Sequence, residues 1–411
     1  MSSIADIRLA PEGEKKINWV ARNMPICNAI AKDFSKSKPL QGLKITLSVH
    51  LEAKTAYLCR VLAMGGAEMY VTGSNPLSTQ DDVAAALAAG GLEVFAHHGC
   101  TMEQYEKDLR AALACGPNII IDDGGDLVHL VHTEMRELLP GVIGGCEETT
   151  TGIHRLKTMD RAGELMFPMV MVNDADCKHL FDNRYGTGQS VFDGINRTTN
   201  LIVAGKYVVV AGYGWCGKGV AMRAKGLGAK VIVTEVNPVR AIEAHMDGFE
   251  VMPMDDAAEL GDIFVTVTGC SGVITEKHFL KMKDGVILSN AGHFDVEVDM
   301  EGLHELATDH YEARHNIEGY LLPNGRTVFV LAEGRLVNIA AGDGHPAEIM
   351  DMSFAIQALS AQYLAGNRGT LKPGVVPVPK GIDLAVALMK LSTLGIQIDE
   401  LTEEQVSYLG L

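Results

Sequence analysis

The chain has 411 residues and a formal net charge of −17, with 47% hydrophobic and 21% charged residues. This length is too great for one ordinary core and predicts two domains of a packed, folded protein. So acidic a chain would repel phosphate backbones, which excludes nucleic acid as a partner. There is no run of about 18 apolar residues and no apolar signal segment, so we expect a cytoplasmic protein without a membrane partner.

The eight cysteines are scattered, with no CxxC pair and no histidines at zinc-finger spacing. Such a pattern argues against a disulfide framework and fits a reducing compartment. We therefore expect no structural metal.

Short apolar runs alternate with helical segments through the first part of the chain. Strands are predicted at 43–50, 67–74, 92–99, 117–123 and 166–174, with helices at 55–66, 80–91 and 102–116. This β–α repetition predicts a parallel sheet covered by helices on both faces.

A second series of buried strands is predicted at 206–212, 230–236, 263–269 and 285–292. A long helical pattern at 346–366 is expected to return to the first domain, and a Pro- and Gly-rich segment then leads to a short tail. The predicted fold class is α/β, with two doubly wound, Rossmann-like domains and a cleft between them.

The segment GYGWCGKG follows the strand at 206–212 and opens a helix. Its GxGxxG glycines are Gly212 for a tight turn, Gly214 for close approach to a pyrophosphate, and Gly217 for helix packing. The helix N-terminus attracts the phosphates. Glu235 ends the next strand, where an acid bonds ribose hydroxyls and repels a 2′-phosphate, so NAD is favoured over NADP.

Polar side chains recur after the strands of the first domain, where open α/β sheets bind their ligands. Taken singly, each Asp or Asn there is equally well explained as a helix cap or turn residue. Their repetition at several strand ends is better explained by a site, which His293 and His345 of the second series would also face. The first-domain residues are His50, Asp122, Asp123, Glu147, Glu148, Thr149 to Thr151, Asn173, Asp174, Lys178, Asp182 and Asn183.

Over nearly its whole length the sequence resembles the S-adenosyl-L-homocysteine hydrolase family. The matching segments are NPLSTQDD, IDDGGDL, EETTTG, VND, FDNRYG, VVVAGYGWCGKG, NAGHFDVE and LAEGRLVN. The resemblance implies tightly bound NAD that is not consumed. Members of the family oxidise the ribose 3′ carbon, which acidifies the 4′ C–H, eliminate homocysteine, add water to the enone and then reduce the ketone again.

The resemblance also implies roles for individual residues. It assigns Lys178, Asp182 and Asn183 to the ribose hydroxyls, with a lowered lysine pKa, and His50, Asp123 and His293 to proton transfer. The implied substrate contacts are Glu52, Lys54, Thr55, Glu148, Lys178, Asp182 and His345. The implied NAD contacts are Thr149, Thr150, Thr151, Asn183, Gly212, Gly214, Trp215, Cys216, Gly217, Glu235 and Asn338.

On this basis residues 1–186, completed by 344–376, are expected to bind the substrate, and residues 187–343 to bind NAD. Residues 377–411 are expected to form a C-terminal tail. The resemblance further implies a homotetramer, a gate at His293 and Phe294 over the homocysteine channel, and the partners nucleosyl-homocysteine, nucleoside and homocysteine.

The chain departs from the family pattern at three places. Many members have Thr and Glu where this chain has Glu52 and Lys54. A lysine only donates hydrogen bonds, which suits the carbonyl of hypoxanthine and suggests S-inosyl-L-homocysteine as substrate, unless Glu52 serves adenine instead. Thr187 stands where a cysteine is frequent, and the basic, tyrosine-containing tail of many members is missing.

Two other functions compete with this interpretation. An NAD-dependent 2-hydroxyacid or amino-acid dehydrogenase also pairs two α/β domains, but it would consume the cofactor. A catalytically silent NAD-binding regulatory protein could keep the fold, although the intact Lys178, Asp182, His50 and His293 argue against it.

Overall fold

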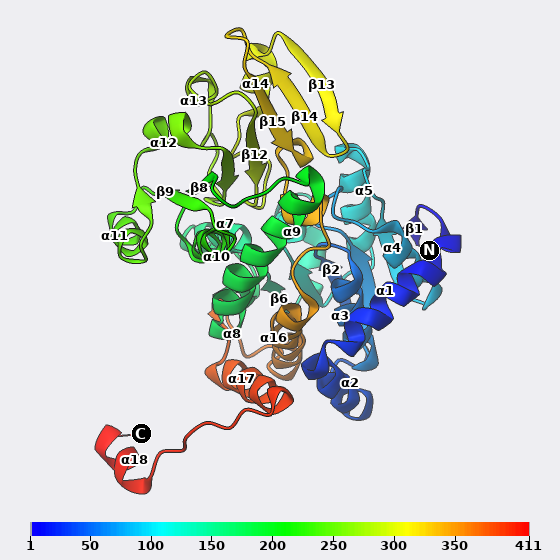
Figure 1. The fold of residues 1–411 in the computed structure, drawn as a ribbon. Helices are drawn as coiled ribbons and strands as arrows, with labels where there is room; N and C mark the ends of the chain where they lie inside the picture. Colours follow the sequence, from blue (N-terminus) through cyan, green and yellow to red (C-terminus); the bar gives the residue numbers. More distant parts are fainter. Residues whose placement is uncertain (1, 411) are drawn as a thin grey trace.

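In the computed structural model, which describes residues 2–410, the chain forms two eight-stranded sheets, each flanked by helices (Figure 1). The first sheet is parallel throughout, in the order β1-β4-β3-β2-β5-β6-β7-β16. Its strands are β1 (Ser3–Ile4), β2 (Lys44–Ser48), β3 (Glu68–Thr72), β4 (Glu93–Ala96), β5 (Ile119–Asp122), β6 (Gly144–Glu147), β7 (Pro168–Met171) and β16 (Gly374–Pro377).

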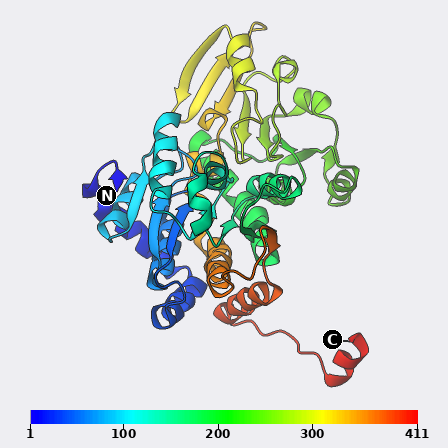
Figure 2. The same ribbon diagram turned by 180° about the vertical axis from the view of Figure 1, so that it is seen from behind.

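The second sheet has the order β10-β9-β8-β11-β12-β15-β14-β13; it is parallel from β10 to β15, and its last three strands, β15, β14 and β13, pair antiparallel with one another. These three strands form an antiparallel meander at one end of the molecule, drawn in yellow in Figure 2. The strands are β8 (Tyr207–Ala211), β9 (Lys230–Thr234), β10 (Glu250–Val251), β11 (Ile263–Thr266), β12 (Val286–Asn290), β13 (Asp309–Arg314), β14 (Ile317–Leu321) and β15 (Thr327–Leu331).

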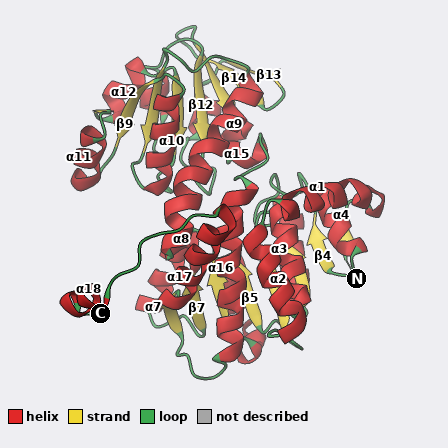
Figure 3. Cartoon of the chain, turned by 60° about the horizontal axis from the view of Figure 1, so that its bottom comes forward, coloured by secondary structure: helices red, strands yellow, loops and turns green. Residues whose placement is uncertain are grey.

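Helices cover both sheets, as Figure 3 shows. Around the first sheet lie α1 (Ala10–Arg22), α2 (Pro25–Ser37), α3 (Ala53–Met64), α4 (Asp81–Ala89), α5 (Met102–Leu113), α6 (Asp126–Thr133), α7 (Thr150–Arg161), α8 (Asp176–Lys178), α16 (Ala347–Gly366) and α17 (Lys380–Leu394). Around the second sheet lie α9 (Thr187–Thr199), α10 (Trp215–Gly226), α11 (Pro238–Met246), α12 (Met254–Leu260), α13 (Glu276–Phe279), α14 (Met300–Leu306) and α15 (Val337–Ala340). The last helix is α18 (Glu403–Leu409).

The central strands are continuously apolar because both of their faces are buried. In β5, Ile119 and Ile121 pack into the core beneath α2, α3 and α16, whereas Ile120 packs into the core beneath α5, α6 and α7. In β8, Val208 and Val209 likewise enter different cores. This two-sided burial is typical of parallel sheets and confirms the predicted pair of doubly wound α/β units.

The fold differs from the sequence-based expectation at several places. Strand β6 was not predicted, because its first residues are Gly144 and Gly145, which have low strand propensity. Side chains do not fit there: a Cβ on Gly145 would lie 2.6 Å from the Ile120 carbonyl oxygen. The meander β13–β15 was also missed, and β16 lies within the segment that was expected to be a linker.

The chain passes between the two sheets at two places, here called the first and the second crossing. The first runs through the π-helix at His179–Gly186 into α9, and the second from α15 into α16. Backbones pack closely at the first crossing, because a Cβ on Gly219 of α10 would lie 1.7 Å from the Arg184 carbonyl oxygen.

The C-terminal part divides into a packed and a projecting segment. Val386 of α17 is fully buried in the core of the first sheet. Beyond α17 the chain leaves the body, and α18 stands apart in both Figure 1 and Figure 2. Over residues 2–410, no helix has both the length and the hydropathy to cross a bilayer.

Candidate active site

A cavity of about 1270 Å³ lies where the carboxyl ends of both sheets face each other. It is lined by every residue expected to bind substrate or cofactor except Gly217. A Cβ on Gly217 would lie 2.0 Å from the Gly212 carbonyl oxygen, so this glycine allows α10 to pack on the turn rather than facing the cavity.

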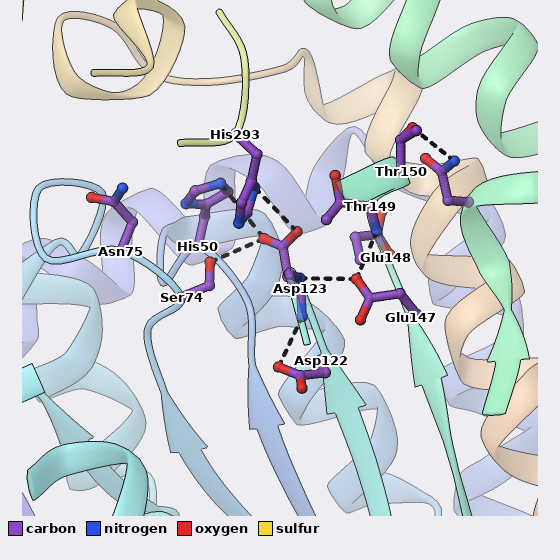
Figure 4. A network of polar contacts seen from close by, with 12 residues as sticks. His50, Ser74, Asn75, Asp122, Asp123, Glu147, Glu148, Thr149, Thr150 and His293 are labelled. Carbon is purple, nitrogen blue, oxygen red and sulfur yellow. Dashed lines mark hydrogen bonds and ion pairs between the residues drawn. The ribbon is translucent and has the colours of Figure 1, made fainter. Parts of the chain in front are cut away.

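The first-sheet side chains of this site are placed by strand order. His50 follows β2, Ser74 follows β3, Asp123 follows β5, and Glu147 and Glu148 lie at the end of β6. Because these neighbouring strands are parallel, their carboxyl ends meet at one edge, and Figure 4 shows the side chains converging there.

Asp123 is the centre of one polar cluster. Its Oδ2 lies 3.5 Å from His50 Nε2 and accepts a 3.0 Å hydrogen bond from Ser74 Oγ. Its Oδ1 lies 3.9 Å from Nδ1 of His293, which comes from the loop after β12 of the second sheet. The cluster therefore unites groups from both sheets.

The tautomer of His50 follows from its neighbours. Ser78 Oγ donates to the Asn75 carbonyl oxygen at 2.9 Å, so it accepts from His50 Nδ1 at 2.8 Å. Burial lowers the pKa of His50 to about 4, despite the opposing charge of Asp123. Neutral His50 therefore keeps its Nε2 lone pair directed at Asp123, an arrangement suited to moving a proton between the two groups.

Metal ligation is a second capability of the same three groups. One ligand atom each of His50, Asp123 and His293 lies within 4.8 Å of the other two. Imidazole and carboxylate are common ligands of divalent cations.

Lys178 is the centre of a second cluster and is buried. Its Nζ donates to Asn173 Oδ1 at 3.2 Å and to Asn183 Oδ1 at 3.0 Å. It also lies 3.4 Å from Asp182 Oδ2 and 3.6 Å from Glu148 Oε1. The π-helical turn brings residues five apart onto one face, which explains how Lys178 meets Asn183.

These charges correct one expectation. Burial by itself would lower the pKa of Lys178, but Asp182 and Glu148 outweigh burial and raise it. Lys178 is therefore an ammonium group and a hydrogen-bond donor, not the neutral base expected from the sequence. Burial raises the pKa of Glu148 to about 7, although Lys178 opposes the shift.

Helix α16 supplies partners that the sequence analysis missed. Ser353 Oγ donates to Asp182 Oδ2 at 2.7 Å, and Gln357 Nε2 donates to Glu148 Oε2 at 2.5 Å. Burial by itself raises the pKa of Asp182, but Lys178 and His345 lower it overall. The sequence could have indicated these partners, because Ser353 and Gln357 are polar residues four apart in an otherwise apolar helical segment and so lie on one face of the helix.

A third group closes the end of the cavity near α3. Glu52 caps this helix: its Oε2 accepts from the Lys54 N–H at 3.0 Å and its Oε1 from the Thr55 N–H at 3.3 Å. Lys54 Nζ lies 2.7 Å from Glu52 Oε2 and donates to the Asp343 carbonyl oxygen at 2.9 Å. Met350 and Phe354, which the sequence analysis did not single out, line the cavity with these residues.

The glycine turn fits a dinucleotide. Gly212 has φ +102°, and a Cβ on Gly214 would meet nothing closer than 3.8 Å, so the backbone is open to a ligand. Glu235 closes the turn by accepting from the Tyr213 N–H at 2.7 Å, and it lines the cavity. Asn338 Oδ1 is buried without a hydrogen-bond partner among the described residues. It could therefore accept a hydrogen bond from the carboxamide of a bound nicotinamide.

Thr187 joins the two crossings. Its Oγ1 lies 3.2 Å from His345 Nε2 and 3.6 Å from Cys216 Sγ, and His345 Nδ1 lies 2.7 Å from Asp182 Oδ1. The position that holds a cysteine in many resembling sequences is thus a hydroxyl here, but a thiol from the glycine turn lies beside it.

Comparison with known proteins agrees with this geometry. Residues 1–141 match the family model described as S-adenosyl-L-homocysteine hydrolase, and residues 183–344 match the model of that family's NAD binding domain. The chain is 58% identical to an S-inosyl-L-homocysteine hydrolase of Methanocaldococcus jannaschii over 409 residues, 100% of this chain and 98% of that protein. It is also 58% identical to an adenosylhomocysteinase of Thermococcus kodakarensis over 406 residues, 99% of this chain and 96% of that protein.

An adenosylhomocysteinase of Thermotoga maritima is 55% identical over 397 residues, covering 97% of this chain and 98% of that protein. The two family models together match well over half of the chain, and one of them supplies the NAD binding domain on which the glycine turn lies. The chain therefore belongs to the S-adenosyl-L-homocysteine hydrolase family.

Proposed function

We propose that this protein reversibly hydrolyses a nucleosyl-homocysteine thioether to the nucleoside and L-homocysteine. The observation that carries the proposal is one cavity that joins the glycine turn, the Lys178 cluster and the Asp123 cluster. NAD, when bound, supplies a reversible oxidation of the ribose 3′ carbon. We assign the substrate to residues 1–186 and 344–376, and NAD to residues 187–343.

The residues have separate tasks in this proposal. The Lys178 ammonium and Asp182 orient the ribose hydroxyls, and Glu148, whose pKa of about 7 suits a general base, accepts the hydroxyl proton. Asp123 and His50 then move protons at the 4′ and 5′ carbons. His293 and Phe294, whose rings lie 4.7 Å apart, close the site against water.

A thiol-release assay with S-inosyl- and S-adenosyl-L-homocysteine tests the proposal. We expect homocysteine to appear without net accumulation of reduced cofactor. Net reduction would instead indicate a dehydrogenase, and no thiol from either thioether would indicate a silent binding protein.

The pH profile should report on Glu148. Because burial raises the pKa of Glu148 to about 7, the protonated form, which is not a base, dominates below that pH. We therefore expect kcat/KM of the wild type to fall about tenfold per pH unit below about pH 7. Glu148→Gln should give a low rate without this acid limb; an unchanged acid limb in the variant would contradict the assignment.

For the nucleobase we propose hypoxanthine. Both carboxylate oxygens of Glu52 already accept hydrogen bonds, whereas the Lys54 ammonium has three protons and two partners. The third proton can be donated to the O6 carbonyl of hypoxanthine, which adenine lacks.

Lys54→Met tests the base preference. We expect wild-type kcat/KM to be higher for the inosyl than for the adenosyl thioether. The variant should lose about 10- to 100-fold on the inosyl substrate only, since a hydrogen bond from a charged donor is lost. Lys107→Met, which changes an exposed lysine of α5, is the matched control. A wild-type preference for the adenosyl thioether would end this proposal.

We also propose a cytoplasmic homotetramer. The projecting C-terminal segment exposes apolar side chains, with Ile398 63% and Tyr408 90% exposed, and such surface is usually covered by another chain. Light scattering of the purified protein should give four times the mass of one chain; the mass of a single chain would contradict the assembly.

A further inference from the structure

The buried carboxyl group of Glu147 takes no part in the chemistry described above. Glu147 is the last residue of β6 and pairs in register with Asp122, the last residue of β5. It is fully buried, and Figure 4 shows it beneath the cluster of Asp123 and His293. A carboxyl group hidden so completely from solvent requires a structural or functional reason.

Glu147 contacts the backbone of two different turns. Its Oε1 accepts from the Gly124 N–H at 2.9 Å and from the Thr149 N–H at 3.1 Å. The first turn carries Asp123, and the second follows Glu148 and leads into α7. One oxygen atom thus links the turn of the Asp123 cluster to the turn of the Lys178 cluster.

The carboxyl group of Glu147 is closely packed. A Cβ on Gly152 of α7 would lie 2.1 Å from Glu147 Cδ, so the helix packs directly on the carboxyl group. The first turn also packs against the ring of His293, because a Cβ on Gly124 would lie 2.6 Å from His293 Nε2. A displacement of this turn would therefore move both Asp123 and His293.

We propose that Glu147 is a positioning residue that fixes the two turns relative to each other by accepting both N–H groups. Burial, together with the charges of Asp122 and Asp123, raises the pKa of Glu147, while the Gly124 and Thr149 N–H groups oppose the shift. A protonated carboxyl group still accepts through its carbonyl oxygen, so length rather than charge is the required property.

Two substitutions separate length from charge. Glu147→Gln keeps the length and a carbonyl acceptor but cannot ionise, whereas Glu147→Asp keeps an acid that is one methylene too short to hold both turns. The inference rests on the proposed hydrolysis, so thiol release by the wild type is measured first; its absence would refute the hydrolysis and not the role of Glu147.

We expect Glu147→Gln to retain kcat within about threefold and to keep the wild-type pH profile. Glu147→Asp should lose about 100-fold in kcat, the effect of a misplacement of about 1 Å, with a smaller change in KM.

Thermal unfolding and the NAD content of each purified variant show whether it is folded. The inference is overturned if a folded Glu147→Gln variant loses as much activity as this, or if Glu147→Asp keeps wild-type kcat. If Glu147→Asp does not fold, the glutamine variant decides alone.

Discussion

Replacing Lys178 with methionine is expected to lower kcat by about 1000-fold, because the ribose hydroxyls lose their only cationic donor in this cluster of the described structure. The bound cofactor should no longer become reduced when nucleoside is added. Absorbance of the reduced nicotinamide and thiol release, measured on the same sample, check both effects.

The stability of this variant should also fall. Removing one partner of a buried ion pair costs about 3 to 5 kcal/mol, because the other charge is left uncompensated. Asp182 keeps its contacts with His345 and Ser353, so we expect the lower end of this range. Lys178→Arg, which keeps the charge but not the geometry, should be more stable and equally slow. Normal cofactor reduction in Lys178→Met would contradict the assigned role.

Replacing Asp123 with asparagine should block a later step. The carboxylate that His50 and His293 face is lost, while the Lys178 cluster is unchanged. We expect kcat for thiol release to fall by about 100- to 1000-fold. The cofactor should still become reduced on adding substrate, so the enzyme should stall in its reduced form.

The contrast between the two variants is the informative result. If Asp123→Asn lost cofactor reduction as completely as Lys178→Met, the two clusters would not act at separate steps. The Ser74 hydroxyl can donate to the asparagine carbonyl oxygen as it does to the aspartate, which should keep the side chain in place. Thermal unfolding should therefore differ little from the wild type.

Most of the architecture could be predicted from the sequence, because burial on both faces leaves continuous apolar runs such as those of β5 and β8. Strand β6 could not, since Gly144 and Gly145 serve close packing there and carry no strand signal. The glycine turn was predictable because strand, turn and helix are contiguous in the chain.

The electrostatics of the site could not be predicted in this way. The pKa of Lys178 depends on Asp182, one turn away, and on Glu148, thirty residues earlier on another strand. Likewise, Ser353 and Gln357 reach the site only because α16 returns to the first sheet. These charges and hydrogen-bond partners come from segments that are far apart in the sequence and meet only in the folded chain.

If the ribose 3′ carbon is oxidised transiently, the 4′ proton is removed and later replaced from solvent, and running the reaction in heavy water detects this exchange. The product nucleoside should then carry deuterium at its 4′ carbon, while hydrogen at the 3′ carbon is retained. Nuclear magnetic resonance of the isolated nucleoside locates the label. Thiol release with no deuterium at the 4′ carbon would indicate that the thioether bond breaks by direct displacement, which contradicts the roles proposed for Asp123 and Lys178.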